Sequence, residues 1–355
     1  MRPSPESEPL RWGILGTGRI AGVFARGLAD SCCGRLVAVG SRSAESSLRF
    51  AAEYRLDSGG AHGSYAALLA DPQVEAIYLA TPHPQHVEWA VKAAAAGKHV
   101  LCEKPLGVNH AEGLRMVAAA RAHRVVLMEA FMYRCHPQTA KIAELIRSGA
   151  LGAVGLVQAA FSFKSDYQPA SRLWANAAAG GGILDVGCYP VSLARWVAGV
   201  VSGQPFLDPV TVTGAGVLHP ESGVDVYAAA TLQFANGVIA QVSAGVGLTQ
   251  DNVVRIYGSE GWLLVPTPWV IRPEGGQSTL WLHRSGATEP EAITVEAGPL
   301  YALEADAFAA AVRSGASEVA AMTLDDTLGN LTTLDRWRAA IGLVYAAERA
   351  GPSSL

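Results

Sequence analysis

The stretch GILGTGRIA, Gly13 to Ala21, decides the fold of this sequence. It closes an apolar run and places Gly16, Gly18 and Ala21 in a G-x-G-x-x-A pattern before a helical segment. In such a turn the first glycine permits a tight bend, the second lets the backbone approach a pyrophosphate, and the small third residue lets helix and strand pack closely. Free N–H groups at the start of the helix then meet the phosphates. The stretch therefore predicts a dinucleotide-binding turn.

Working outward, strands and helices alternate over the first third of the chain. A strand that alternates with a helix is typical of a parallel, doubly wound sheet. Ser43 is a plausible N-cap, and Asn109 with Glu112 resembles a capping box. The expected strands are 12–16, 35–42, 74–81, 99–103 and 124–131, and the expected helices 19–30, 43–54, 84–97 and one after Asn109.

The middle of the chain has strand patterns without long helices between them. Asn236-Gly237 is a strong hairpin signal, and a second tight turn follows Tyr257. Helical patterns return at 301–315 and 324–348. We expect an α/β Rossmann domain over residues 1–130, and an α+β domain with a large, mostly antiparallel open sheet over residues 131–355. The expected strands of that sheet are 155–163, 210–218, 226–234, 238–246, 252–258, 261–266 and 279–283.

Composition narrows the class of protein. The chain has 355 residues, of which 50% are hydrophobic and 16% charged, which is typical of folded domains. A net charge of −4 argues against a nucleic-acid partner, and no apolar run approaches the ~20 residues of a membrane span. Five cysteines without paired spacing favour reduced thiols and a cytoplasmic location. No metal-ligand spacing is evident, so no metal is expected.

The end of the second strand bears on the choice of nucleotide. An acidic residue there would bind the ribose of NAD, but this strand ends in Ser41 and Arg42. A hydroxyl and a guanidinium suit a 2′-phosphate, so NADP is favoured and NAD remains possible. The alternative is that Arg42 only caps a surface loop. The expected cofactor-binding residues are Gly16, Thr17, Gly18, Arg19, Ile20, Ser41, Arg42, Thr81, Pro82, His86, Glu103 and Lys104.

Histidines in the turn after the third long strand have a plainer interpretation. Thr81 ends that strand, and a turn stiffened by Pro82 can line the nicotinamide side of a crevice. For His83 and His86, a surface or helix-start histidine is a better interpretation than a catalytic one.

The stretch VLCEKPLG, Val100 to Gly107, places a lysine where a buried strand ends. The carboxyl ends of parallel strands open onto ligand crevices. Lys104 is therefore either an ordinary solvated lysine or a cation positioned beside a bound cofactor.

A second candidate site lies in GGGILDVGCYP, Gly180 to Pro190. Asp185 and Tyr189 are four residues apart and would share a helix face. A phenol is a competent acid or base if a cation such as Lys104 lowers its pKa. The alternative is a core tyrosine and a helix-capping aspartate. The expected catalytic residues are Lys104, Tyr189 and Asp185, and the expected substrate-binding residues are Phe163, Arg172, Trp174, Asp185 and Tyr189, with Trp174 also a candidate core residue.

Together GTGRIA, ATPHPQHVEWAVKAAAAGKHVLCEKPLGVN and GGGILDVGCYPVSLARW resemble the Gfo/Idh/MocA family of oxidoreductases over essentially the whole chain. The resemblance implies a Rossmann domain followed by an α+β domain with an open sheet. It also implies a pyridine nucleotide and a polyol, sugar or diol substrate, with Lys104 as a catalytic or orienting cation. Many members carry a histidine where this sequence has Tyr189. That departure resembles the branch with dimeric dihydrodiol dehydrogenase and glucose–fructose oxidoreductase, where the tyrosine is the acid/base.

These observations predict an NADP-dependent oxidoreductase that transfers a hydride between nicotinamide and a secondary alcohol or ketone of a sugar, polyol or cyclic diol. One alternative is a sugar–sugar oxidoreductase that retains its NADP, and another is a non-catalytic NADP-sensing protein. Apolar alternation between Val224 and Val246 suggests that a second subunit covers the open sheet, as a homodimer or larger homo-oligomer.

Overall fold

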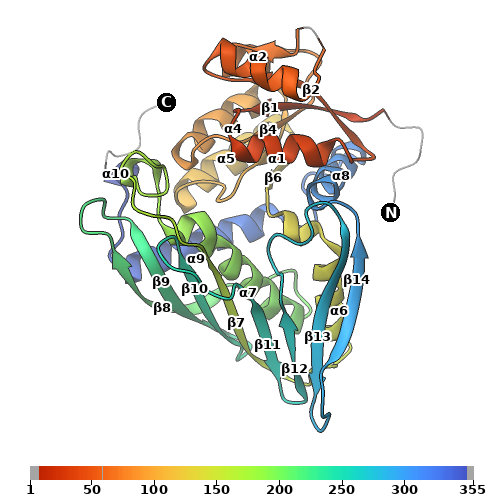
Figure 1. The fold of residues 1–355 in the computed structure, drawn as a ribbon, viewed down its shortest axis with the longest axis vertical. Coiled ribbons are helices and arrows are strands. Elements are labelled where there is room, and N and C mark those ends of the chain that lie inside the picture. Colours follow the sequence, from red (N-terminus) through yellow and green to blue (C-terminus); the bar gives the residue numbers. More distant parts are fainter. Residues whose placement is uncertain (1–7, 58, 350–355) are drawn as a thin grey trace.

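A computed structural model describes residues 8–57 and 59–349 of the chain, built on two sheets (Figure 1). The first sheet has six parallel strands in the order β3-β2-β1-β4-β5-β6. This is the doubly wound arrangement that the alternating pattern predicted. Its strands are β1 (Leu10–Leu15), β2 (Gly34–Gly40), β3 (Ala61–His62), β4 (Ala76–Leu79), β5 (His99–Cys102) and β6 (Leu127–Glu129), and its helices are α1 (Arg19–Leu28), α2 (Ala44–Glu53), α3 (Tyr65–Ala70), α4 (His86–Ala95) and α5 (His110–His123).

The second sheet has eight strands in the order β14-β13-β12-β11-β7-β10-β9-β8. Only β7 and β10 pair in parallel, so the predicted mostly antiparallel sheet is confirmed. The strands are β7 (Val154–Ser162), β8 (Pro209–Leu218), β9 (Asp225–Phe234), β10 (Ile239–Gly245), β11 (Val254–Gly258), β12 (Gly261–Val265), β13 (Gly276–Arg284) and β14 (Glu291–Ala297).

Helices cover one side of this second sheet. Helix α6 (Pro137–Arg147) contacts β14, α7 (Cys188–Val201) contacts β7 and β10, and α9 (Leu324–Ala340) contacts β8 (Figure 1). Two of the C-terminal helices also return to the first layer, where α8 (Leu300–Arg313) packs on α1 and α9 packs on α5. The last helix is α10 (Ala346–Arg349).

Several local predictions hold and others need correction. Ser43 caps α2 and Asn109 caps α5, each by accepting a backbone N–H. The helix expected at 84–97 starts with a 3₁₀ turn, His83–Gln85, before α4. The pattern expected to be helical over 324–348 breaks after α9, where Gly342 has a φ of +71°. The sequence patterns did not predict β3, α3, α6 or β14.

One helical run, Asn176–Val201, is long and apolar enough to cross a membrane, but every residue of its most apolar window is buried inside the protein. This burial is expected for the core helix of a domain whose other layers cover it on all sides.

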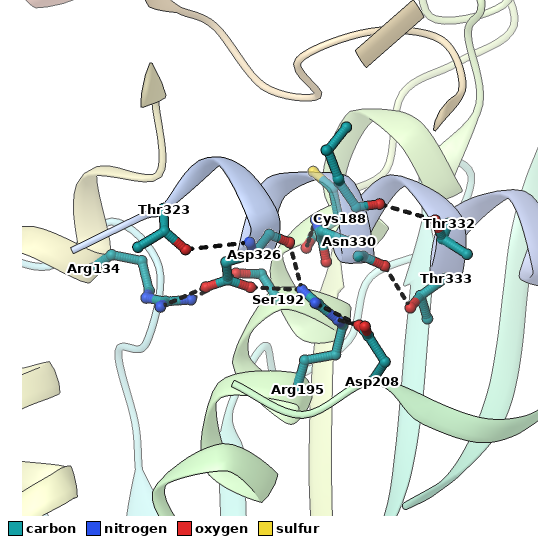
Figure 2. A network of polar contacts seen from close by, with 12 residues as sticks. Arg134, Cys188, Ser192, Arg195, Asp208, Thr323, Asp326, Asn330, Thr332 and Thr333 are labelled. Carbon is teal, nitrogen blue, oxygen red and sulfur yellow. Dashed lines mark hydrogen bonds and ion pairs between the residues drawn. The ribbon is translucent and has the colours of Figure 1, made fainter. Parts of the chain in front are cut away.

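A buried charge network fixes α7 against α9 (Figure 2). Asp326 on α9 accepts from Arg195 at 2.6 Å and from Arg134 at 2.8 Å, and Arg195 also binds Asp208 at 2.6 Å. Arg195 is fully buried, so its charge requires these partners. Gly329 leaves the room for it, because a Cβ there would lie 2.0 Å from the guanidinium. The network therefore fixes the helix on which Tyr189 is placed.

Candidate active site

A cleft of about 700 Å³ opens where the strands of the first sheet end. Helix α1 and the loops after β4 and β5 form one wall, and residues of the second domain form the other. The lining residues are Gly18, Arg19, Ile20, Val23, Arg26, Gly27, Asp30, Ala80, Thr81, Pro82, His83, Glu103, Lys104, Met132, Phe161, Arg172, Asp185, Tyr189, Val270, Pro273, Glu274 and Tyr301.

Gly16 and Gly18, the two glycines of the turn after β1, serve different purposes. Gly16 has a φ of +112°, and a Cβ there would lie 2.9 Å from the carbonyl oxygen of Ala80. Gly18 lines the cleft at the N-cap of α1, and a Cβ there would meet no protein atom within 4 Å. Packing therefore requires Gly16, whereas Gly18 keeps open the space in front of the helix N-terminus. That space and the free N–H groups fit a dinucleotide pyrophosphate.

Ser41 and Arg42 follow β2 directly beside this turn. The N–H of Gly16 donates to the carbonyl of Gly40 at 2.9 Å, which fixes the turn to the end of β2. Ser41 is buried, and its hydroxyl accepts from the N–H of Ser43 at 3.3 Å, while Arg42 is exposed. Neither residue lines the cleft, and neither does Thr17.

Lys104 reaches across from the end of β5 to the second domain. Its Nζ donates to the backbone carbonyl of Asp185 at 2.6 Å and lies 5.2 Å from the centre of the Tyr189 ring. The N–H of Lys104 donates to Glu103, which in turn accepts from the buried hydroxyl of Tyr78. Lys104 is thus an anchored cation in the wall of the cleft, which excludes the interpretation as a solvated loop lysine.

The charge of Lys104 is maintained by its neighbours. Burial alone lowers the pKa of the ammonium, but the carboxylate of Asp185, with Cys188 and Glu103, outweighs burial and raises the pKa of Lys104 above its ordinary value. Burial raises the pKa of Asp185, but Lys104 and Arg172 outweigh it and the net pKa is lowered. Both groups are therefore ionised at neutral pH.

Asp185 is fixed through both its backbone carbonyl, which accepts from Lys104, and its carboxylate, which binds Arg172. It lies on a π-helical turn, Ile183–Gly187, that precedes α7, so the regular α-helical spacing expected between it and Tyr189 is wrong. Both side chains nevertheless line the cleft. The carboxylate of Asp185 binds Arg172 at 2.9 Å, and Arg172 itself lies in the wall of the cleft, where it orients Asp185.

Tyr189 lies at the start of α7 inside an aromatic cage. Its ring is surrounded by the rings of Phe131, Phe161, Tyr133 and Trp269 at centre distances of 5.1–6.0 Å. The hydroxyl donates to the sulfur of Met132 at 3.5 Å, which is a weak acceptor. Because the hydroxyl has so weak a partner, it is available to a ligand in the cleft.

The expected lowering of the Tyr189 pKa is not what the structure shows. Burial, followed by the negative charge of Glu103, raises the pKa of Tyr189 well above its usual value. Lys104 directs its ammonium at the carbonyl of Asp185 rather than at the phenol. Tyr189 is therefore a protonated donor at neutral pH.

Both histidines of the turn after β4 are buried, so a surface location is wrong, but each begins a helical turn, His83 the 3₁₀ turn and His86 α4. The ring nitrogens of His86 contact the carbonyls of Thr81 at 2.9 Å and Pro105 at 3.0 Å, and His86 does not line the cleft. His86 was expected to contact the cofactor, but in the structure it joins the loop after β4 to the loop after β5. His83 does line the cleft, and burial, then His86, lowers its pKa to about 3, which keeps it neutral.

The aromatic residue that lines the cleft is Phe161, two residues before the predicted Phe163. Trp174 is buried against Tyr167 and His219, and neither Trp174 nor Phe163 lines the cleft. Phe161 of β7 lines it instead, together with Met132. The alternative interpretation of Trp174, as a core residue, is the correct one. No sequence signal distinguishes Phe161 from Phe163, because both belong to the same face of the strand expected over 155–163, whereas β7 ends at Ser162.

The triple glycine serves internal packing. A Cβ on Gly180 would lie 2.5 Å from the carbonyl of Arg172, and one on Gly182 would lie 2.7 Å from Gly245 of β10. Asp225, buried on β9, accepts from the N–H of Ile183 at 2.7 Å. The glycines thus bring the turn that carries Asp185 against the second sheet.

Comparisons with known proteins agree with this geometry. Residues 10–131 match the model of an oxidoreductase family with an NAD-binding Rossmann fold, and residues 139–264 match the model of the GFO/IDH/MocA C-terminal domain. The chain belongs to the Gfo/Idh/MocA family of oxidoreductases. The resemblance stated from the motifs, the fold class and the expectation of an oxidoreductase are therefore confirmed.

Individual members of this family match over most of their length. A trans-1,2-dihydrobenzene-1,2-diol dehydrogenase from Mus musculus is 36% identical over 262 residues, 73% of this chain and 75% of that protein. The same-named protein from Sus scrofa is 32% identical over 96% of this chain and 99% of its own. A 3-ketoreductase from Actinomadura kijaniata, solved with NADP and TDP-benzene, superimposes with a TM-score of 0.84 at 28% identity, covering 94% of this chain and 98% of that one.

Proposed function

We propose that this chain is an NADP-dependent oxidoreductase that interconverts a secondary alcohol and a ketone of a sugar, polyol or cyclic diol. One observation carries the proposal: Gly18, the Lys104 ammonium and Tyr189 line one cleft between the two domains. An open cradle for a pyrophosphate, a fixed cation and an available phenol are the parts that hydride transfer to a carbonyl requires.

When bound, the nicotinamide supplies or accepts the hydride. Tyr189 donates its phenolic proton to the carbonyl oxygen as the ketone is reduced and recovers a proton there in the reverse reaction. Its raised pKa keeps the phenol protonated at neutral pH, as a donor in the direction of reduction must be. Lys104, kept charged by Asp185, stabilises negative charge that develops on the substrate oxygen or on the phenol.

The remaining charged groups position the substrate. Asp185 presents a carboxylate that accepts from neighbouring hydroxyls of a diol or sugar, and Arg172 fixes its orientation at 2.9 Å. Arg172 is about half exposed, so it has donors left for the substrate. The cleft is lined by both charged and apolar residues, with Arg172 and Asp185 beside Phe161 and Met132, which suits a molecule that has both a polyhydroxylated and an apolar face.

The preference for NADP rests on Arg42. Its exposed guanidinium follows β2 next to the glycine turn, and a guanidinium binds phosphate through a forked pair of hydrogen bonds. The 3-ketoreductase solved with NADP supports this preference, because its fold superimposes on nearly the whole chain. The substrate class has its support in the diol dehydrogenases named above.

We also propose a homo-oligomer built on the second sheet, in a cytoplasmic location. Strand pairing places one residue of each strand side by side in a row across the uncovered face, from β8 at one end to β13 at the other. The row consists of Thr213, Thr231, Gln241, Gln158, Arg255, Leu264 and Trp281. Val217, Tyr227, Ile239 and Trp281 are exposed apolar residues of this same face. A second copy would cover them, because exposed apolar residues gathered on one face mark an interaction surface. Five free thiols support a reducing compartment.

The function is tested by a screen with a matched pair of lysine variants. Purified protein is titrated with NADP⁺ and NADPH and assayed against sugars, polyols, cyclic diols and their ketones by nicotinamide absorbance. Lys104→Met keeps the side-chain length but removes the charge, and we expect kcat to fall by ~10²–10⁴-fold. Lys98→Met is the control, since Lys98 also donates to backbone carbonyls, those of Asp71 and Val74, but lies outside the cleft.

The control variant should lose stability and keep kcat. Protein that binds NADPH but turns over no member of the screen would contradict the enzyme and favour a sensing protein. Turnover of two sugars together without added nucleotide would instead favour an enzyme that retains its NADP. Equal kcat losses in both variants would contradict the role of Lys104.

A further inference from the structure

Two adjacent thiols lie outside the cleft, at the junction of the two domains. Cys32 and Cys33 occupy the loop between α1 and β2, and their sulfur atoms are 3.0 Å apart. Asp306 of α8 points at the same loop, with its Oδ2 3.1 Å from the Cys32 sulfur. The sequence separates the carboxylate from the thiols by more than 270 residues, so only the fold brings these three donors together.

The carboxylate is oriented by groups of the loop. Its Oδ1 accepts from the hydroxyl of Ser31 and from the N–H of Cys33 at 3.1 Å, and its Oδ2 accepts from the N–H of Cys32 at 3.4 Å. The Ser31 oxygen is fixed in turn by the N–H of Gly34 at 2.8 Å. An oriented carboxylate of this kind is a feature of built metal sites, where outer groups hold the ligand in position.

The donor set selects a class of ion. The ligand atoms of Cys32, Cys33 and Asp306 all lie within 4.8 Å of one another. Two thiolates and one carboxylate suit Zn²⁺, which takes sulfur at ~2.3 Å and carboxylate oxygen at ~2.0–2.2 Å in a tetrahedron. The pair of sulfurs must open by less than about 1 Å to reach the edge of such a tetrahedron. Cys32 is exposed, which gives an ion an entry path and leaves the fourth position to water.

We propose that Cys32, Cys33 and Asp306 form a binding site for Zn²⁺ or another thiophilic divalent cation. Binding forms two metal–sulfur bonds and one metal–oxygen bond and releases both thiol protons to solvent, with no change of oxidation state. The ion would join the α1–β2 loop to α8. It would act as a clamp between the domains, since α1 and α8 each also supply residues to the cleft, Gly27 and Tyr301 among them.

Cobalt titration tests the proposal directly. Tag-free protein, reduced and freed of metal, is titrated with Co²⁺, and Zn²⁺ is then added in competition. We expect one ion per chain, a near-ultraviolet thiolate-to-cobalt band with the visible spectrum of a tetrahedral site, and loss of both on addition of Zn²⁺. Zn²⁺ should also raise the denaturation midpoint of the wild-type protein.

Variants assign the ligands. Cys32→Ser and Cys33→Ser should each reduce the charge-transfer band by half or more, the double variant should abolish it, and Asp306→Asn should weaken Zn²⁺ binding ~10-fold or more. Cys135→Ser is the matched control, since Cys135 is a half-buried thiol elsewhere in the chain, and its spectrum should equal that of the wild type. Affinity for NADPH, measured on each variant, reports that the Rossmann domain is folded.

A wild-type spectrum without the thiolate band would overturn the proposal, as would unchanged Zn²⁺ affinity in the Cys32→Ser/Cys33→Ser double variant. The three residues are then a thiol–carboxylate hydrogen-bond cluster only. Should a serine variant fail to fold, alkylation of the wild-type protein decides. Zn²⁺ must slow labelling of Cys32 by iodoacetamide at least tenfold relative to Cys135, as mapped by mass spectrometry, and equal rates with and without Zn²⁺ reject the site.

Discussion

Replacing Tyr189 by phenylalanine removes one oxygen atom and keeps the packed ring. The lost hydroxyl donates to the sulfur of Met132 at 3.5 Å, a weak hydrogen bond, while the ring contacts of the aromatic cage persist in the variant. We therefore expect the free energy of unfolding to change by less than ~1 kcal/mol. A general acid contributes ~10²–10⁴-fold to a proton transfer, which corresponds to ~2.7–5.4 kcal/mol of transition-state stabilisation.

Tyr133→Phe is the matched control for that experiment. Tyr133 belongs to the same cage, 6.0 Å from Tyr189 between ring centres, but it is not a lining residue of the cleft. Its buried hydroxyl donates to Ser192 at 2.9 Å, and the loss of this bond should cost ~1 kcal/mol of stability. We therefore expect opposite outcomes for the two variants: Tyr189→Phe should lower kcat with little change in stability, and Tyr133→Phe should lower stability with little change in kcat.

The assay combines urea denaturation with steady-state kinetics at saturating NADPH and the best ketone of the screen. Nucleotide affinity should be unchanged in Tyr189→Phe, because Tyr189 belongs to the second-domain wall of the cleft and the glycine turn to the first-domain wall. If the Tyr189→Phe enzyme keeps at least half of the wild-type kcat, Tyr189 is not the proton donor, and its burial in the cage is purely structural.

Three further predictions concern the nucleotide, the core and the assembly. Arg42→Ala should weaken NADP⁺ binding by ~1.5–3 kcal/mol and leave NAD⁺ nearly unchanged in a fluorescence titration, and equal losses for both nucleotides would contradict the assignment. Burial raises the pKa of Glu129 to about 8, so between about pH 5 and pH 8 the folded protein retains a proton that the unfolded chain has released. Because of Glu129, the free energy of unfolding should fall by up to ~1.4 kcal/mol for each unit by which the pH rises in this range. Glu129→Gln should remove this pH dependence in urea denaturation, and an unchanged pH dependence would mean that another group titrates. Light scattering at micromolar concentration should give at least twice the chain mass of 37.0 kDa, and Tyr227→Glu on the open sheet face should reduce it to that of a monomer; a monomeric wild-type protein would refute the assembly.

The local signals of the sequence were sufficient for the architecture. Gly16 must adopt a positive φ, Ser43 and Asn109 cap the helices that follow them, and period-2 and helical patterns differ over each segment. These features depend on the conformation of a few neighbouring residues, so they can be read without the fold. The sequence also predicted the glycine turn and the location of Lys104 at the end of a strand, where the parallel strands of this fold open onto a crevice.

The chemical state of the site was decided by the tertiary structure. Trp174 and Phe161 are both aromatic residues near the expected wall, and only long-range packing buries the first beside His219 and places the second in the cleft. The pKa of Tyr189 rises because the cage and Glu103 surround it, although the sequence favoured a lowered value. Backbone conformation is set mainly by near neighbours along the chain, whereas burial and charge environment are set by residues hundreds of positions apart, as Asp306 beside Cys32 also shows.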